Sequence, residues 1–248
     1  MPACSKSKND TSVTPLNPLV FLPRFQHITE DIFEKMDPDT YIHTYIATLK
    51  IFRQFSKSWQ EFIDNHTILW KDARGTKAFL SACKHGHSKM VGFLIQNSKK
   101  FNIDLNAKSN NGHTAFHYVC IYGHQKIAEI LMHKSTAFNI NLNARDQTDQ
   151  TGFHYACLYS DKKLVEMILQ KSKEFNIDLN AKTTNGMTAL HYAVRNGDTK
   201  LVEMIIQKST ECNIDLNAKN KNNQTALDLA CKDSKIVHML NKNQQTLN

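Results

Sequence analysis

The sequence Thr188-Ala189-Leu190-His191 recurs in related form every 37 residues, and this spacing decides the fold. The related tetrads begin at Lys77, Thr114, Thr151 and Thr225. A second marker, Leu-Asn-Ala, keeps the same step and begins at Leu105, Leu142, Leu179 and Leu216. Two markers in register indicate a tandem repeat, and repeats of this length stack into solenoids. The sequence therefore predicts an elongated array of five units over residues 71–248.

Each unit reads as a tight turn followed by two helices. Asn111-Gly112 supplies the positive φ that a turn needs. Counterparts of this turn occur at Gly75, Asp149, Gly186 and Asn223. Thr114 then stands at the N-cap of a short first helix, and Gly123 is placed to end it. A second helix is expected from about Lys126, so the fold class is all-α, built from helix-turn-helix units.

These residues together resemble the ankyrin repeat family. The match includes the Asn-Gly turn, the Thr-Ala-Phe-His helix start, Gly123-His124 and the Leu-Asn-Ala step, and it covers residues 71–248. The resemblance implies a solenoid with short β-hairpin loops, in which His117, His154 and His191 hydrogen-bond to neighbouring turns. The five units would span about 71–104, 105–141, 142–178, 179–215 and 216–248. The usual unit has 33 residues, so a longer second helix or a larger outer loop must absorb about four more.

The chain before the repeats has a different character. Residues 1–20 have too little apolar content to fold alone, and we expect a disordered lead. Residues 21–70 are predicted to form a small helical module. Its segment Phe55–Asn65, followed by Leu69-Trp70-Lys71, resembles the closing half of an F-box, and Leu22-Pro23 with Ile32-Phe33 resembles the opening half.

The F-box resemblance implies binding of the Skp adaptor of a cullin-RING ubiquitin ligase through apolar side chains. The residues it assigns to this role are Leu22, Pro23, Ile28, Ile32, Phe33, Met36, Trp59, Leu69 and Trp70. The alternative is that residues 21–70 are a helical cap that covers the apolar end of the array. Both interpretations are compatible with the apolar pattern.

The six cysteines indicate a reducing compartment. Four of them, Cys83, Cys120, Cys157 and Cys231, occupy one equivalent repeat position, where a free cysteine serves as a small hydrophobic side chain. Neighbouring layers of packed helices lie about 10 Å apart, which is too far for a disulfide. The sequence has no run of 18 apolar residues and no hydrophobic signal core. We therefore expect a location in the cytosol or the nucleus and no membrane span.

No constellation in the sequence points to catalysis. The cluster Cys83-Lys84-His85-Gly86-His87 is the sharpest candidate for a metal site, but its ligands would point apart and no second pair with zinc spacing follows. Motifs for a serine nucleophile, a phosphate loop or a zinc protease are absent. We expect no catalytic residue, no metal and no cofactor.

The positive charge lies in the repeats. The net charge is +8, of which residues 1–70 contribute −1 and residues 71–248 contribute +9. Clustered lysine and arginine residues suggest a nucleic acid or a membrane surface as a partner. Acidic residues such as Asp146, Glu166 and Glu203 are interspersed, however, so a solvated basic face or an acidic protein partner is the favoured interpretation over specific nucleic-acid binding.

By resemblance, an ankyrin array binds partners through its hairpin tips and the exposed side of its first helices. The partner-binding residues predicted on this basis are His113, Ile121, Tyr122, Gln150, Leu158, Tyr159, Met187 and Arg195. Apolar and aromatic residues on a solvent face suggest contact anchors. For the two tyrosines, packing against the adjacent repeat is an equally weighted alternative.

The leading hypothesis is a non-catalytic adaptor that is monomeric outside its complex. The F-box-like module would recruit the Skp adaptor, and the repeats would hold a protein substrate of unknown identity for ubiquitin transfer. The alternative is a plain ankyrin binding or scaffold protein whose N-terminal helices are only a cap. Binding to nucleic acid or to a membrane surface is a third, weaker hypothesis.

Overall fold

The computed structural model describes residues 73–230 and 234–246, and these residues form helices and loops without strands. The short first helices of the units are α4 (Ala73–Lys84), α7 (Ala115–Tyr122), α9 (Gly152–Leu158), α11 (Ala189–Arg195) and α13 (Ala226–Leu229). The second helices are α5 (Ser88–Gln96) with α6 (Ser98–Phe101), α8 (Gln125–Phe138), α10 (Lys162–Lys171), α12 (Thr199–Cys212) and α14 (Ser234–Thr246). The all-α solenoid predicted for the repeats is confirmed.

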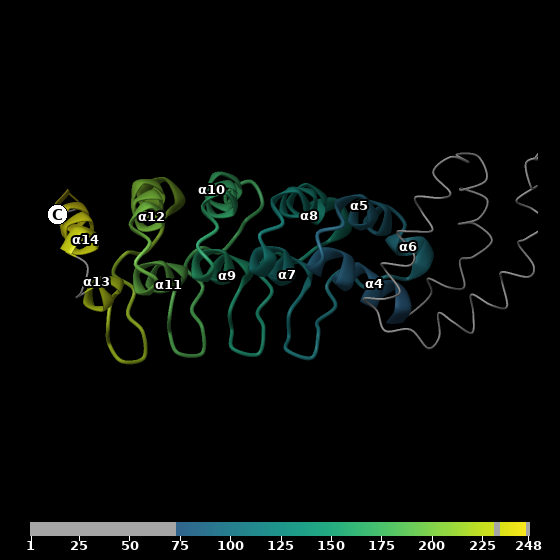
Figure 1. Ribbon diagram of the computed structural model, residues 1–248, viewed down its shortest axis with the longest axis horizontal. Helices are drawn as coiled ribbons and strands as arrows, with labels where there is room; N and C mark the ends of the chain where they lie inside the picture. Colours follow the sequence, from purple (N-terminus) through teal and green to yellow (C-terminus); the bar gives the residue numbers. More distant parts are fainter. Residues whose placement is uncertain (1–72, 231–233, 247–248) are drawn as a thin grey trace, which may run out of the picture.

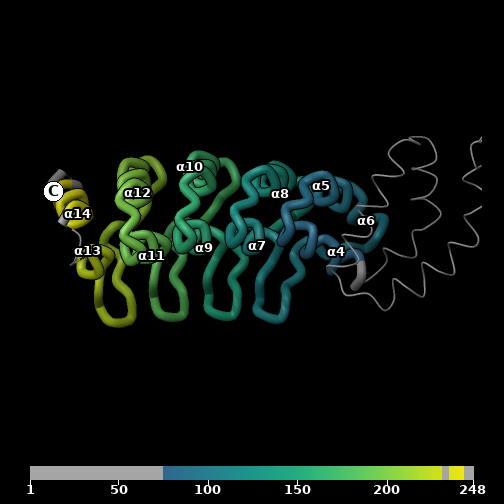
Figure 2. The backbone as a smooth tube through the Cα atoms, viewed as in Figure 1, coloured from purple at the N-terminus to yellow at the C-terminus, as the bar shows by residue number. Residues whose placement is uncertain are grey.

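The helices form two parallel layers, and the long loops project beyond the layer of first helices (Figure 1). Each first helix packs on the next, α4 on α7, α7 on α9 and α9 on α11, and each second helix packs behind its own unit. The tube in Figure 2 shows the same step repeated along the stack, with one finger-like loop per unit. The core is correspondingly elongated, because each unit buries its apolar face mainly against its neighbours.

The predicted cysteine position lies in this core. Cys83, Cys120 and Cys157 are fully buried and free, and Val194 fills the same place in the fourth unit. Burial raises the pKa of each of these thiols, so they stay protonated and act as small apolar groups. Cys231 lies outside the described residues. Within the described part of the chain, no helix is long and apolar enough to cross a membrane.

The threonine and histidine of the tetrad cap the first helices. At α7 the Thr114 backbone N–H donates to Nδ1 of His117 over 3.1 Å. Because Nδ1 accepts this bond, the other ring nitrogen, Nε2, carries the proton and donates to the Gln150 carbonyl of the next loop over 2.9 Å. His154 and His191 repeat the arrangement toward the carbonyls of Met187 and Gln224. The bond from each histidine to a neighbouring turn is therefore confirmed.

An asparagine side-chain amide ties each loop to the next. Asn143 donates through Nδ2 to the Asn176 carbonyl over 2.7 Å, and its Oδ1 accepts the N–H of Asp178 over 2.8 Å. The same pair of bonds joins Asn106 to the loop at Asn139 and Asn180 to the loop at Asn213. We call this pair of bonds the asparagine clamp, made by the asparagine of the Leu-Asn-Ala marker.

The loops form tight turns but no strands in the described residues, so only part of the β-hairpin expectation is met. In the second unit, Ser109 N–H donates to the His113 carbonyl over 2.9 Å and Gly112 N–H donates back to Ser109 over 2.8 Å. The positive φ falls where the sequence predicts, at Gly112, Asp149, Gly186 and Asn223. One turn closed by so few bonds is too short to establish a strand ladder.

The second helix is long in two of the 37-residue units. α8 and α12 each run for 14 residues, and each is followed by a C-cap asparagine, Asn139 or Asn213, in the left-handed conformation. Asparagine tolerates this conformation better than most residues. In these two units the longer helix is observed, whereas α10 has 10 residues, ends at Lys171 and is followed by turns.

The first described unit departs from the prediction. Gly75 was expected to form a turn and Lys77 to begin a helix, but α4 runs without a break from Ala73 to Lys84. The tetrad in this unit has Lys77 and Leu80 in place of threonine and histidine. A helix start needs a side chain that accepts its free backbone N–H groups, and neither lysine nor leucine has an oxygen or a ring nitrogen to do so. No new helix therefore begins at Lys77, and α4 continues through this position.

Gly152 replaces the alanine of the other tetrads for a packing reason. A β-carbon on Gly152 would lie 2.6 Å from Cδ1 of Phe116 and 3.0 Å from Sγ of Cys120. An alanine methyl group does not fit at that separation unless Phe116 moves. The glycine therefore allows α9 to approach α7 closely.

The capping histidines make stability depend on pH. Burial, opposed by the hydrogen bond to Met187, lowers the pKa of His154 to about 4, and burial also lowers the pKa values of His117 and His191. The unfolded chain therefore binds more protons than the folded chain between about pH 4 and pH 6.5. The stabilisation that comes from keeping these histidines neutral is fully present above pH 6.5 and is lost as the pH falls toward 4. His154 alone contributes a loss of about 2 kcal/mol between pH 7 and pH 5.

Urea unfolding of the wild type and of His154→Gln at pH 7 and pH 5 measures this contribution. We expect His154→Gln to be less stable than the wild type at pH 7 and to lose less stability on acidification. Equal losses in the two proteins would contradict the assignment to His154.

Candidate protein-binding surface

Five tyrosines lie along the first helices of the three central units. Tyr118, Tyr155 and Tyr192 occupy one repeat position, and Tyr122 and Tyr159 occupy the position one turn later. We call these five residues the tyrosine strip. Tyr122 and Tyr159 are 50% and 57% exposed, and no other large hydrophobic side chain in the described part of the chain is as open to solvent. The strip thus presents aromatic surface to water at two adjacent units.

Ring contacts connect the strip from unit to unit. His113 meets the rings of Tyr118 and Tyr155 edge-on, with centroids 5.5 and 5.4 Å apart. The two exposed rings each stack on a less exposed ring of the strip: Tyr122 on Tyr118, with centroids 6.5 Å apart, and Tyr159 on Tyr155, with centroids 6.4 Å apart. The predicted residues His113, Tyr122 and Tyr159 are therefore brought together by the fold.

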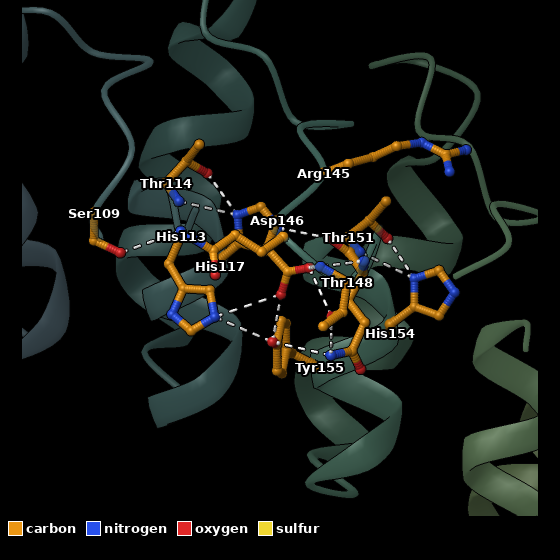
Figure 3. A network of polar contacts seen from close by, with 12 residues as sticks. Ser109, His113, Thr114, His117, Arg145, Asp146, Thr148, Thr151, His154 and Tyr155 are labelled. Atoms are coloured by element: carbon orange, nitrogen blue, oxygen red, sulfur yellow. Dashed lines mark hydrogen bonds and ion pairs between the residues drawn. The ribbon is translucent and has the colours of Figure 1, made fainter. Parts of the chain in front are cut away.

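A buried carboxylate holds Tyr155 in place (Figure 3). The Tyr155 hydroxyl donates to Oδ2 of Asp146 over 2.6 Å. The other oxygen, Oδ1, accepts the backbone N–H groups of Thr148 and Gln150 and the Thr148 hydroxyl, at 2.7 to 3.0 Å. His113 Nε2 lies 3.5 Å from Oδ2 and 3.1 Å from the Tyr155 oxygen. With its side chain only 3% exposed, Asp146 has its hydrogen-bonding capacity filled.

The network keeps Asp146 charged and Tyr155 protonated. Burial by itself would raise the pKa of Asp146, but the hydrogen bonds from Tyr155, Thr148 and the Gln150 backbone outweigh it and lower that pKa. Burial, together with the adjacent carboxylate, raises the pKa of the Tyr155 phenol. The hydroxyl is thus a permanent donor at neutral pH, and the ring on which Tyr159 stacks has a fixed orientation.

This network occurs at a single junction of the described array. The positions equivalent to Asp146 are Ser109, Thr183 and Asn220, and each of these short polar side chains accepts the backbone N–H four residues later. None of them is charged. Gln150, a predicted partner-binding residue, is half-buried here because its amide donates to Tyr155 over 3.1 Å and to the Thr148 hydroxyl over 2.9 Å.

The other predicted residues differ in how exposed they are. Ile121 and Leu158 are half-buried and pack against the core, which favours a structural role for most of their surface. Met187 was expected at an open hairpin tip, but it is only 9% exposed, and its sulfur lies 3.5 Å from Nδ2 of Asn220 in the next loop. Because the loops stack side by side, Met187 faces the adjacent loop. Arg195 is exposed, with its guanidinium 5.0 Å from the Tyr192 ring centroid.

The nine residues predicted to bind a Skp adaptor lie outside the described residues, so their prediction stays a prediction. In the described ranges no group of three histidine, cysteine or acidic side chains is arranged to hold a metal ion, the Cys83–His87 cluster included. Tyr118, Tyr155 and Tyr192 were not predicted as site residues. Their 37-residue spacing was visible in the sequence, but the link from Tyr155 to Asp146 was not.

Tyr155→Phe tests the network, with Tyr192→Phe as its matched control at the same repeat position. Removing the Tyr155 hydroxyl takes away the hydrogen-bond donor to Oδ2 of the buried Asp146, so the free energy of unfolding should fall by about 1–3 kcal/mol. The Tyr192 hydroxyl makes no hydrogen bond to a described residue, and its removal should change the free energy of unfolding by less than about 0.5 kcal/mol. Urea unfolding at pH 7 gives both values, and equal effects would rule out the network as the cause.

Comparison with known proteins agrees with the repeat architecture. A family model described as ankyrin repeats in three copies matches residues 49–146 and 153–248, which is well over half of the chain. Its first match begins within the range 21–70, and no family match supports the F-box-like module. A search of curated proteins finds none that matches this chain. Ankyrin repeats serve protein–protein interaction, in general without catalysis. The chain belongs to the ankyrin repeat family.

Proposed function

We propose that this protein is a non-catalytic binding module that holds a partner protein against the tyrosine strip. The exposure of Tyr122 and Tyr159 on neighbouring units carries this proposal. Tyrosine is enriched among the residues that contribute most to interfaces, because a large ring is buried at a small cost in side-chain entropy. Tyr122 is the last residue of α7 and Tyr159 directly follows α9, so one exposed ring stands at the end of each of two consecutive first helices.

The strip is also arranged before any partner arrives. Tyr159 stacks on Tyr155, and Tyr155 is held by Asp146 and packed against His113. Side chains that are already fixed lose less freedom on binding, so more of the contact energy appears as affinity. The matching helices α7, α9 and α11 contain no aspartate or glutamate, and Arg195 is held beside Tyr192. A partner with apolar and acidic side chains fits this surface.

Selection of peptides on the full chain tests the proposal. Binders from a random 12-residue peptide library are measured by calorimetry against the wild type and Tyr122→Ala/Tyr159→Ala. The matched control is Glu129→Ala/Glu166→Ala, an exposed pair with the same 37-residue spacing on the second helices. We expect the tyrosine double variant to bind at least tenfold more weakly and the control to bind within about twofold of wild type. Peptides that bind the tyrosine variant as tightly as wild type would refute the proposal.

A second proposal concerns residues 21–70, in which the segment Phe55–Asn65 and Leu22-Pro23 resemble an F-box. On this proposal the module recruits a Skp-type adaptor, and the repeats present a protein substrate to the ubiquitin ligase. The proposal rests on these sequence segments. The competing assignment is a cap on the array, which is favoured by the ankyrin match that begins at residue 49.

Co-purification of the full chain with a purified Skp-type adaptor decides between the two assignments. Recruitment predicts that the wild type retains the adaptor and that joint substitution of Leu22, Pro23, Ile32 and Phe33 by alanine abolishes retention. A cap predicts no retention by the wild type. Thermal unfolding of both proteins distinguishes a lost interface from a lost fold.

A further inference from the structure

A row of cations runs along the loops, with one per unit. Lys108, Arg145, Lys182 and Lys219 each follow the Leu-Asn-Ala marker, and all four side chains are exposed. We call these four residues the basic row. Like the tyrosine strip it repeats every 37 residues, but it lies on the loops that project from the first helices (Figure 1).

Backbone carbonyls hold three of these side chains along the stack. Lys108 Nζ donates to the Arg145 carbonyl over 2.8 Å, and Arg145 Nη1 donates to the Lys182 carbonyl over 2.8 Å. Lys182 Nζ donates in the same way to the Lys219 carbonyl over 3.1 Å. Each contact uses one of the three donors of a lysine or the five of an arginine. The remaining donors stay available for a ligand, and the cations are held at the repeat spacing.

Within the described residues, Lys108, Arg145 and Lys182 make no ion pair with a carboxylate, whereas Lys219 is near enough to Asp228 to lower the pKa of that carboxyl group. Lysines of the second helices differ, because Lys162, Lys171 and Lys208 pair with Asp198, Glu174 and Glu211 at 2.6 to 2.8 Å. Asp146 follows Arg145 directly in the sequence, but Figure 3 shows the Arg145 side chain extending away from the Asp146 carboxylate. That carboxylate already accepts hydrogen bonds from Tyr155 and from its own loop. Asp104, Asp178 and Asp215 accept the backbone N–H two residues later and make no ion pair with the row.

The spacing of the row specifies the ligand. Packed helices lie about 8–10 Å apart, so successive cations lie about 10 Å apart along the stack. A peptide in the extended polyproline II conformation advances about 3.1 Å per residue with three residues per turn, so every third side chain recurs on the same side at about 9 Å. We infer that the basic row binds an extended segment of a partner protein that carries an acidic residue at every third position. This inference rests on the proposed function and adds the chemistry of the partner.

The row suits a peptide better than a nucleic acid. Nucleic acid carries a negative charge at about every 3.4 Å of each strand. The exposed carboxylates of Asp104, Asp178 and Asp215 lie on the same loops as the row and would repel such a dense polyanion. A peptide with one carboxylate in three residues places neutral side chains between its charges.

Fluorescence anisotropy with the full chain tests the inference. The probes are two labelled 12-residue peptides of identical composition, made of serine, glycine and four aspartates. One has aspartate at positions 1, 4, 7 and 10, and the other has it at positions 1, 3, 5 and 7. At low salt we expect the three-residue spacing to bind at least fivefold more tightly. Equal affinity of the two peptides, or no binding of either, would overturn the inference.

A pair of triple variants locates the site. Lys108→Gln/Arg145→Gln/Lys182→Gln keeps a donor near each carbonyl and removes three charges. Lys126→Gln/Lys163→Gln/Lys200→Gln removes the same charge with the same 37-residue period from exposed positions on the second helices. We expect at least tenfold weaker peptide binding for the first variant and less than threefold for the second. Equal weakening would show general attraction and not a site, provided that both variants unfold at the wild-type temperature.

Two further outcomes separate this inference from its alternatives. A 12-nucleotide single strand that binds more tightly than either peptide, and loses affinity in the row variant, would assign the row to nucleic acid and overturn the inference. If peptides from the library selection bind through Tyr122 and Tyr159 but are indifferent to the row variant and the spaced peptide fails to bind, the proposed function stands and the row inference falls.

Discussion

The structure depends on two kinds of side-chain bond that hold each loop to the neighbouring parts of the stack. The histidine of the tetrad reaches the turn of the following unit, as His117 does to the Gln150 carbonyl, and the asparagine clamp joins the loop at the start of a unit to the loop at its end, as Asn143 does to Asn176. These bonds lie at separate points of the loop, so they fix its orientation as well as its distance. A repeat protein is stabilised by such nearest-neighbour interfaces rather than by one central core.

A fixed step between units turns a sequence period into a pattern on the surface. Residues that recur every 37 positions line up in space, whether they are buried cysteines, stacked tyrosines or exposed cations. The second helices neutralise several of their lysines with nearby carboxylates, whereas Lys108, Arg145 and Lys182 on the loops make no ion pair with a described residue. Open aromatic rings and unneutralised charge thus lie on the first helices and the loops, which is where we place recognition.

The period and the residue types could be predicted from the sequence because both are local. Thr114 and Gly123 mark the ends of one helix through bonds within a few residues, and the structure has them there. The first unit was predicted wrongly because its position in the repeat was given more weight than Lys77, which cannot cap a helix. Met187 was misplaced because its burial depends on the neighbouring loop.

The polar network at Asp146 was out of reach for a different reason. It joins His113, Asp146 and Tyr155, which lie up to 42 residues apart and meet only after the units have stacked. Nothing in the repeat pattern distinguishes Asp146 from Ser109 or Thr183 until the partner hydroxyl is placed. Asp146 is one of the residues that differ from the other units at their repeat position. The contacts of such residues form only when the units stack, so the repeat pattern alone does not predict them.

A crystal structure of the full chain with the peptide that has aspartate at every third position would test the central claim most directly. The claim is that the fixed step between repeats sets the spacing of the recognised groups. It predicts an extended peptide along the loops, with successive carboxylates within hydrogen-bonding distance of Lys108, Arg145 and Lys182 in that order. A peptide that lies across the second helices, or that meets one cation alone, would contradict it.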